Sequence, residues 1–234
     1  MSFQIAIDGP VAAGKGTVSK LVAKRLGFVY IDTGAMYRVA ALIALKKEVN
    51  WENAAVVADL VDRAEIILKN PSGNEIDSRQ TTVIVDSVDV SWAIRTEEIG
   101  RGASEVAKLP EVRKVLVKKQ QLIAATTDVV MEGRDITFRV LPQADLKIYL
   151  TASDSVRAAR RHQELLVRGE DVSLDKVLSD LHTRDQQDME RDTDPLHIVD
   201  DAWVLDTSTL TIEQVVDQIE HRVKSIIINR RGEA

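Results

Sequence analysis

A glycine-rich segment near the start of the chain has the residue types and spacing of a phosphate-binding loop. Gly9 and Gly14 stand five positions apart, and Lys15 follows directly. Glycine lets the backbone wrap closely around a phosphate and point its N–H groups at the oxygen atoms, while the lysine adds a mobile positive charge. The predicted loop consists of Gly9, Pro10, Val11, Ala12, Ala13, Gly14, Lys15, Gly16 and Thr17.

Two clusters of polar residues follow other candidate strands. One runs from Asp32 to Arg38, and the other is Glu132-Gly133-Arg134-Asp135. In an open parallel sheet the carboxyl ends of the strands face the ligand crevice, so Arg38 and Arg134 are candidates to bind a second phosphate. Alternatively, Arg38 is an exposed residue at a helix start, and Arg134 belongs to a structural ion pair.

The residues around the loop indicate how it is positioned. The apolar run 3–8 predicts a buried strand that ends at Gly9, and apolar residues at helical spacing in 18–26 predict a helix that ends at Gly27. A second strand is expected at 28–31. This order predicts a right-handed βαβ unit and therefore a parallel sheet.

Further apolar runs complete the expected fold. Strands are predicted at 129–131, 146–150 and 203–205, and helices begin at Pro110, after Ser153 and after Thr211, where Gln214 completes a capping box. The fold class is therefore α/β, with a five-stranded parallel sheet flanked by helices. One stretch, 64–91, shows strand patterns around a turn at 70–74, which predicts a small inserted antiparallel subdomain.

Composition narrows the classes of function. The chain has 234 residues, of which 44% are hydrophobic, enough for one large domain with a packed core. Its 31 Lys and Arg against 37 Asp and Glu give a net charge of −6, so no overall positive field attracts nucleic acid or a membrane. The absence of cysteine excludes disulfides and thiol catalysis. No leader-like or membrane-spanning run is present in the sequence, and we expect a cytoplasmic monomer.

Five ordered motifs resemble the bacterial cytidylate kinase family over essentially the whole chain. They are Ile7-Asp8-Gly9-Pro10 with Gly14-Lys15-Gly16-Thr17, the segment 32–38, Ile94-Arg95-Thr96, Gly133-Arg134-Asp135, and Arg184-Asp185-x-x-Asp188-x-x-Arg191 ahead of Pro195-Leu196. The resemblance implies a P-loop kinase core and transfer of the γ-phosphoryl group of ATP to CMP or dCMP. It also implies Mg²⁺, with Thr17 or water completing the metal shell because serine or threonine does not directly follow Lys15.

The resemblance also assigns roles to individual residues. Catalytic roles fall to Lys15, Arg38, Arg134, Arg157 and Arg161, and residues 9–17 bind ATP. The positions that match the substrate-binding residues are Thr33, Tyr37, Arg38, Ser104, Arg113, Arg134, Asp135, Arg184, Asp188 and Arg191. Among these, the cytosine readers are Ser104, Arg113, Asp135 and Arg191, and the ribose contacts are Arg184 and Asp188.

The family comparison divides the chain into one P-loop kinase domain, 1–234, with a nucleoside-monophosphate-binding subdomain at 64–108 and a lid segment at 153–170. Arg157, Arg160 and Arg161 resemble the arginines of the lid, and Arg168 is a further candidate. The other interpretation of this run is a solvated helix face.

One departure from the family pattern bears on the site. The family usually continues Gly-Arg-Asp with Ile-Gly-Thr, whereas this chain has Ile136-Thr137-Phe138. If the glycine position requires a positive φ, Thr137 is strained or the loop takes another path.

Two alternatives to cytidylate kinase activity remain. One is another P-loop small-molecule or nucleotide kinase, and the other is an ATP-binding regulator without turnover. A guanine-binding Asn-Lys-x-Asp motif is absent from the sequence, which disfavours a GTP switch protein.

Overall fold

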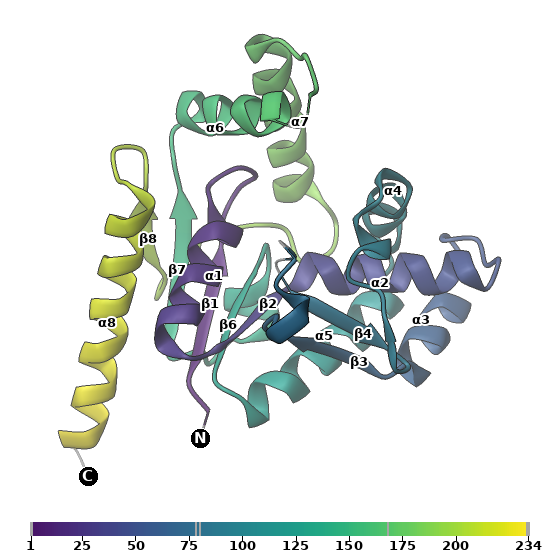
Figure 1. The fold of residues 1–234 in the computed structure, drawn as a ribbon, viewed down its shortest axis with the longest axis horizontal. Helices are drawn as coiled ribbons and strands as arrows, with labels where there is room; N and C mark the ends of the chain where they lie inside the picture. Colours follow the sequence, from purple (N-terminus) through teal and green to yellow (C-terminus); the bar gives the residue numbers. More distant parts are fainter. Residues whose placement is uncertain (1, 78, 80, 168, 233–234) are drawn as a thin grey trace. The chain divides into compact units, whose positions relative to one another are not determined.

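The computed structural model describes residues 2–77, 79, 81–167 and 169–232. It contains a five-stranded parallel sheet in the order β2-β6-β1-β7-β8 (Figure 1), which confirms the predicted fold class. The strands of this sheet are β1 (Gln4–Asp8), β2 (Val29–Asp32), β6 (Val129–Gly133), β7 (Leu146–Thr151) and β8 (Trp203–Asp206). Each predicted strand is present, with ends shifted by at most two residues.

The chain divides into two compact units. The first unit consists of residues 1–3 and 28–131, and the second of residues 4–27 and 132–234. Each unit carries its own group of candidate site residues. The predicted bounds of the subdomain, 64–108, and of the lid, 153–170, stay predictions.

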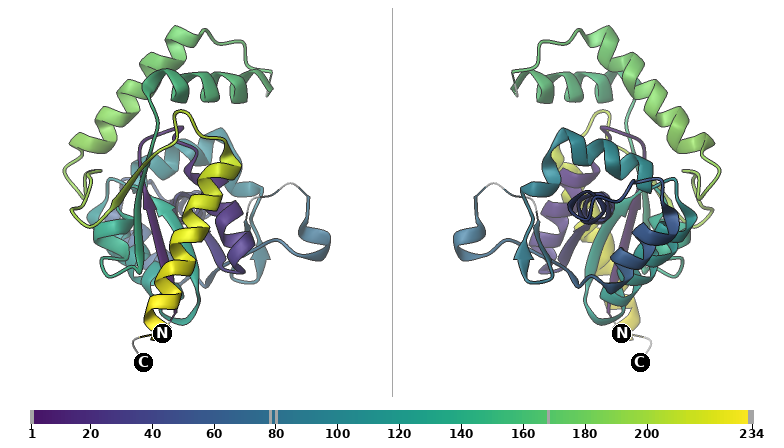
Figure 2. Two further views of the ribbon diagram at one scale, coloured as in Figure 1. Left: turned by 90° about the vertical axis from the view of Figure 1, so that its left-hand side faces the viewer. Right: turned by 90° about the vertical axis from the view of Figure 1, so that its right-hand side faces the viewer.

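In the second unit, β1 pairs in parallel with β7, and β7 with β8. The residues of β1 from Ile5 to Asp8 are fully buried, as the continuous apolar run predicts. The helices of this unit pack in pairs, α1 with α8 and α6 with α7 (Figure 2). Their bounds are α1 (Lys15–Leu26), α6 (Asp154–Val167), α7 (Leu174–Glu190) and α8 (Ile212–Gly232), and a single π-helical turn, η3, covers Ile136–Val140.

Two predicted helix ends of the second unit are confirmed, the C-terminus of α1 and the N-terminus of α8. Gly27 caps α1 in the left-handed region, with φ 73°. Before α8, the Gln214 N–H donates to Thr211 Oγ1 at 3.2 Å, and the Thr211 N–H donates to Gln214 Oε1 at 2.9 Å, which completes the capping box. Arg25 at the end of α1 forms ion pairs with three acidic residues of α8 and so ties the two helices together.

In the first unit, α2 packs against α4, and α3 against α5. The helices are α2 (Thr33–Lys46), α3 (Ala54–Arg63), α4 (Glu97–Val106) and α5 (Pro110–Thr126), with Pro110 in the first turn as predicted. The 64–91 stretch forms an antiparallel sheet in the order β3-β4-β5, as expected. Its elements are β3 (Ile66–Lys69), β4 (Thr82–Val85), β5 (Val88–Asp89) and the 3₁₀ turns η1 (Gly73–Glu75) and η2 (Ala93–Arg95).

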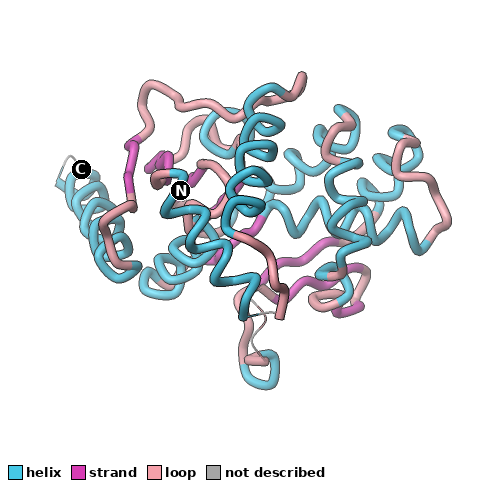
Figure 3. The backbone as a smooth tube through the Cα atoms, turned by 90° about the horizontal axis from the view of Figure 1, so that it is seen from above, coloured by secondary structure: helices cyan, strands magenta, loops and turns pink. Residues whose placement is uncertain are grey.

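The small sheet buries one face. Leu68, Val83 and Val85 have exposed fractions of 8% or less, while Ile67 on the other face is 41% exposed. The turn η1, which follows β3 in the chain, lies away from this sheet (Figure 3). Within the residues that the structure covers, we find no helix long and apolar enough to cross a membrane.

Candidate active site

The loop predicted to bind phosphate lies between β1 and α1, as expected. Gly9 is required by close packing, because a Cβ atom there would lie 2.0 Å from the carbonyl oxygen of Leu150. Gly14 has φ 90° and stands at the N-terminus of α1, where the first N–H groups of the helix lack intrahelical acceptors. Ala12 also has a positive φ, 59°, a conformation that costs a non-glycine residue about 1 kcal/mol or more.

Lys15 is directed into its own loop. Its Nζ donates to the carbonyl oxygens of Gly9 and Pro10, each at 2.8 Å, and the side chain is buried. Burial, followed by the positive charge of Arg134, lowers the pKa of Lys15 to about 7. A bound phosphate would add negative charge beside this buried amine and favour its protonated form.

The loop is held from α6 and α7. The Val11 N–H donates to Asp185 Oδ1 at 3.1 Å, and Arg157 Nη1 donates to the Val11 carbonyl oxygen at 3.0 Å. Arg157 Nη1 also pairs with Asp185 Oδ2 at 2.5 Å, so the contacts of Arg157 and Asp185 form a closed ring with the backbone N–H and C=O of Val11. The side chains of Val11 and Ala12 pack against the buried apolar cluster of α6 and α7.

The candidate lid arginines differ in environment. Arg157 is only 4% exposed, so the interpretation as a solvated face is wrong at this position; its Nε has no hydrogen-bond partner among the residues described. Arg160 donates to Thr207, and Arg161 pairs with Glu164 at 3.0 Å on the same helix. Arg168 lies outside the described residues.

Arg134 follows β6 and reaches α7. Its Nε pairs with Asp188 Oδ2 at 2.6 Å, and Nη1 donates to the Gly133 carbonyl oxygen. Both partners of the ion pair are half-buried, so the guanidinium is ordered and partly accessible. Two residues with predicted roles in substrate binding, Arg134 and Asp188, are therefore in contact.

The turn after Arg134 is anchored on Asp8. The buried Asp8 carboxylate accepts hydrogen bonds from the N–H groups of Ile136 and Thr137 and from Thr137 Oγ1. Burial raises the pKa of Asp8, and these hydrogen bonds oppose that change. Thr137 is not among the non-glycine residues with positive φ in the described chain, so the expectation of backbone strain at Thr137 is wrong. The chain instead forms the π-helical turn η3 at this point.

The remaining candidates of the second unit are Arg184 in α7, Arg191 directly after α7, and Asp135 directly before η3. Arg191 Nε donates to the Asp194 carbonyl oxygen at 2.8 Å, which orders the guanidinium. Arg184 is exposed, and Asp135 is buried. The Leu196 N–H donates to the Asp188 carbonyl oxygen, so the segment after α7 folds back on the helix.

In the first unit, Arg38 projects from α2. Its Nη1 donates to the Ile94 carbonyl oxygen at 3.3 Å in η2. A Cβ atom on Gly100 of α4 would lie 3.1 Å from the same Nη1, so the absence of a side chain at Gly100 leaves room for the guanidinium. Asp32 caps α2 through the Ala35 N–H, which positions the helix that carries Arg38.

The other candidates of the first unit come from α2, α4 and α5. The Arg113 guanidinium lies 5.8 Å from the centre of the Tyr37 ring and donates to the Ala107 carbonyl oxygen. Ser104 is exposed and donates to Gly100 on the same helix, and Thr33 is buried at the start of α2. The structure thus brings Tyr37 and Arg113, which are far apart in the sequence, into contact.

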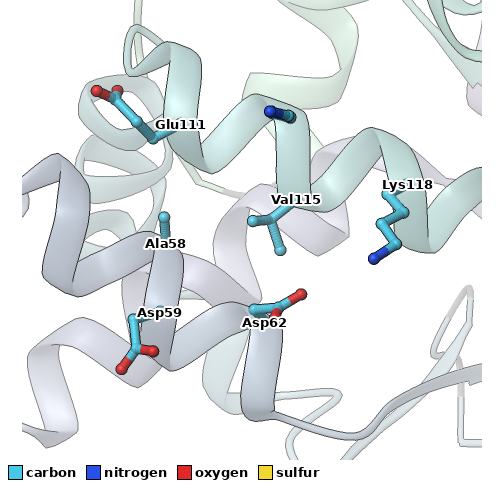
Figure 4. A pocket seen from close by; sticks show the side chains of 7 residues that line it. Ala58, Asp59, Asp62, Glu111, Val115 and Lys118 are labelled. Atoms are coloured by element: carbon cyan, nitrogen blue, oxygen red, sulfur yellow. The ribbon is translucent and has the colours of Figure 1, made fainter.

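A groove between α3 and α5 has no part in this arrangement (Figure 4). Charged and apolar side chains of both helices line it, and none of its residues has a predicted site role. The lining residues are Ala58, Asp59, Asp62, Glu111, Lys114, Val115 and Lys118.

Thr17 is the one candidate metal ligand from the sequence. Its side chain is exposed in the first turn of α1, and its hydroxyl makes no hydrogen bond to any described residue. A hydroxyl oxygen is a ligand that Mg²⁺ accepts together with phosphate oxygens and water. Among the described residues, no group of three or more His, Asp or Glu side chains is placed to hold a metal ion.

Sequence reasoning assigned no role to Asp8 or Asp185. In the structure, Asp8 anchors the turn after Arg134, and Asp185 holds the phosphate-binding loop through Val11 and Arg157. Both belong to the quoted motifs, but a sequence motif does not reveal a partner. A signal was nevertheless present at Asp8, because a carboxylate at the end of a buried strand requires hydrogen-bond donors.

A parallel α/β sheet whose first strand leads through a glycine-rich lysine loop into a helix defines a P-loop kinase fold. The family model for cytidylate kinase matches residues 5–225. The chain therefore belongs to the cytidylate kinase family.

Individual relatives agree with this family. A cytidylate kinase from Caldicellulosiruptor bescii is 41% identical over 227 residues, which cover 97% of this chain and 98% of that protein. A cytidylate kinase from Streptococcus sanguinis is 43% identical over 225 residues, covering 96% and 98%. One from Streptococcus pneumoniae is 42% identical over 220 residues, covering 94% and 96%.

Proposed function

We propose that this protein transfers the γ-phosphoryl group of ATP to CMP or dCMP, giving ADP and CDP or dCDP. The observation that carries the proposal is the loop of residues 9–17, in which the buried Lys15 stands at the N-terminus of α1. Family membership supports the choice of acceptor.

ATP binds through the loop. The N–H groups at the start of α1 donate to phosphate oxygens, and Lys15 turns from the carbonyl oxygens of Gly9 and Pro10 to the phosphates. Thr17 is the residue that would hold Mg²⁺, which neutralises charge on the donor phosphates when bound.

CMP binds through the other residues assigned by the family pattern. Arg38 and Arg134 hold its phosphate, Arg184 and Asp188 contact the ribose, and Tyr37 and Thr33 lie on the same helix as Arg38. The cytosine base is read by Ser104, Arg113, Asp135 and Arg191. Asp135 accepts from the exocyclic amine, and Arg113 donates to the acceptor edge.

Phosphoryl transfer then depends on position and charge rather than on a general base. Lys15, Arg157 and Arg161 stabilise the charge that spreads over the transferring group. Arg157 is paired with Asp154 and Asp185, so it must exchange at least one of these partners to act on the phosphate.

The test is ADP release with a panel of monophosphates and alcohols as acceptors. The parent protein should release ADP with CMP and dCMP, and Lys15→Met should lower turnover about a thousandfold while the protein stays folded, because it removes a cationic contact to the transition state worth several kcal/mol. Lys15→Met activity within tenfold of the parent contradicts the assignment of the loop.

The same panel separates the alternatives. ADP release with another acceptor and not with CMP indicates another P-loop kinase. ATP binding without ADP release in the presence of any acceptor indicates a regulator. A monomeric state, a cytoplasmic location and the absence of nucleic-acid partners stay predictions.

A further inference from the structure

The turn η3 is fixed at its first residues by a buried carboxylate. Asp8 is fully buried and accepts from the Ile136 N–H at 3.0 Å, the Thr137 N–H at 2.8 Å and Thr137 Oγ1 at 2.7 Å. Asp8 is also the last residue of β1 and directly precedes Gly9. The start of the turn is therefore tied to the base of the phosphate-binding loop.

The next residues of the turn hold the segment after α7. The ring of Phe138 stacks on His197 with centroids 4.1 Å apart, and Arg139 Nε lies 3.7 Å from Asp194 Oδ1. The carbonyl oxygen of Asp194 in turn accepts from Arg191. Displacing the 194–197 segment would thus move the acceptor that orders the Arg191 guanidinium.

Both ends of this arrangement carry residues that the proposed function assigns to the cytosine base. Asp135 directly precedes the turn, and its carbonyl oxygen accepts from the N–H groups of Arg139 and Val140 within the turn. Arg191 is ordered by the segment on which Phe138 stacks. The turn therefore connects two proposed base readers that are 56 positions apart in the sequence.

We propose that Thr137 and Phe138 are positioning residues that set the choice of base, Thr137 by fixing Asp135 through Asp8 and Phe138 by fixing Arg191 through the 194–197 segment. Neither side chain is assigned a contact with the nucleotide. The inference rests on the proposed function, because it assumes that Asp135 and Arg191 read cytosine.

The first test is Thr137→Val, which keeps the shape and the backbone N–H but removes the hydroxyl donor to Asp8. A hydrogen bond to a charged group corresponds to about tenfold to a hundredfold in an equilibrium. We expect the ratio of kcat/KM for CMP to that for UMP to fall about fivefold or more, with KM for ATP within twofold of the parent. Thr137→Ser restores the donor and should return the ratio to within twofold.

Phe138→Leu provides an independent variant, because it removes the stacked ring at a half-buried position. It should raise KM for CMP more than KM for UMP and leave KM for ATP within twofold. Thr126→Val is the matched control, since it removes an exposed hydroxyl at the end of α5 that bonds only to its own helix. It should change none of these quantities.

Melting temperatures of all variants distinguish positioning from plain stability. Variants that melt lower but keep the parental ratio of CMP to UMP efficiency refute the inference and leave the proposed function intact. A parent protein that releases no ADP with CMP refutes the proposed function, and the inference with it. A lower ratio of kcat/KM for CMP to that for UMP in Thr137→Val, which Thr137→Ser restores, supports the role of the turn in positioning the residues that read the base.

Discussion

ATP binding should take up a proton at alkaline pH, because burial lowers the pKa of the Lys15 amine and a bound phosphate would raise it again. Burial and the charge of Arg134 lower the pKa of Lys15 from 10.5 to about 7. At pH 8.5 the side chain is then almost entirely neutral, with roughly one protonated molecule in thirty. Phosphate oxygens beside the amine favour the charged form, so binding of ATP restores the proton.

The number of protons taken up for each ATP bound follows from the pKa of Lys15. At pH 8.5 about one proton should be taken up for each ATP bound, and at pH 6 only about 0.1, since most Lys15 side chains already carry their proton. The affinity for ATP should fall by about tenfold for each pH unit above 7. The phosphates of ATP add little proton uptake at pH 8.5, because the second pKa of a phosphate monoester is about 6.

The lowered pKa of Lys15 also determines whether its contribution to the free energy of unfolding rises or falls with pH. Between pH 7 and 10.5 the unfolded chain binds more protons at Lys15 than the folded chain does. The contribution of this residue to the free energy of unfolding therefore rises with pH across that window, and it is lowest below about pH 7.

The assay is titration calorimetry with a non-hydrolysable ATP analogue and Mg²⁺. Comparing two buffers with different ionisation enthalpies at each pH gives the number of protons taken up. Lys15→Arg is the control, since a guanidinium stays charged at pH 8.5 and should abolish the uptake. Heat that does not depend on the buffer at pH 8.5, or equal uptake in Lys15→Arg, refutes the reasoning.

Further predictions concern the acceptor site and the loop. Arg134→Ala should raise KM for CMP and lower kcat with KM for ATP nearly unchanged; a lower melting temperature with parental kinetics would instead mark its pair with Asp188 as structural. Asp135→Ala should reduce kcat/KM for CMP much more than for UMP, and so lower a parental preference for CMP over UMP of about tenfold or more. Asp188→Ala should reduce kcat/KM for both nucleotides alike. Equal losses for CMP and UMP in the Asp135 variant would mean that other residues read the base. Gly9→Ala should destabilise the fold by several kcal/mol because its Cβ meets a backbone oxygen at 2.0 Å, while Gly73→Ala, with no atom within 4 Å, should cost only about 1 kcal/mol in thermal or denaturant unfolding.

The phosphate-binding loop, two helix ends and the strands of the parallel sheet could be predicted from the sequence, because each depends on residues close together in the chain. The loop 9–17 is recognisable because close approach to a phosphate requires glycine and lysine at a fixed spacing. The C-terminus of α1 was predictable from its left-handed glycine cap, and the N-terminus of α8 from its capping box. Both motifs use residues within a few positions of each other. The strands of the parallel sheet follow from continuous apolar runs, since both faces of such a sheet are buried.

The contacts between groups far apart in the sequence could be identified only from the folded structure. Thr137 stood out in the sequence as a possible source of strain, and it proves to be a donor to Asp8, 129 positions away. Arg157 has the helical spacing of a solvated face but is buried against Asp185 and the Val11 peptide. Sequence periodicity records which face of an element is apolar, whereas the partner of a buried charge depends on how separate elements pack, and that packing is settled by long-range contacts that no local pattern contains.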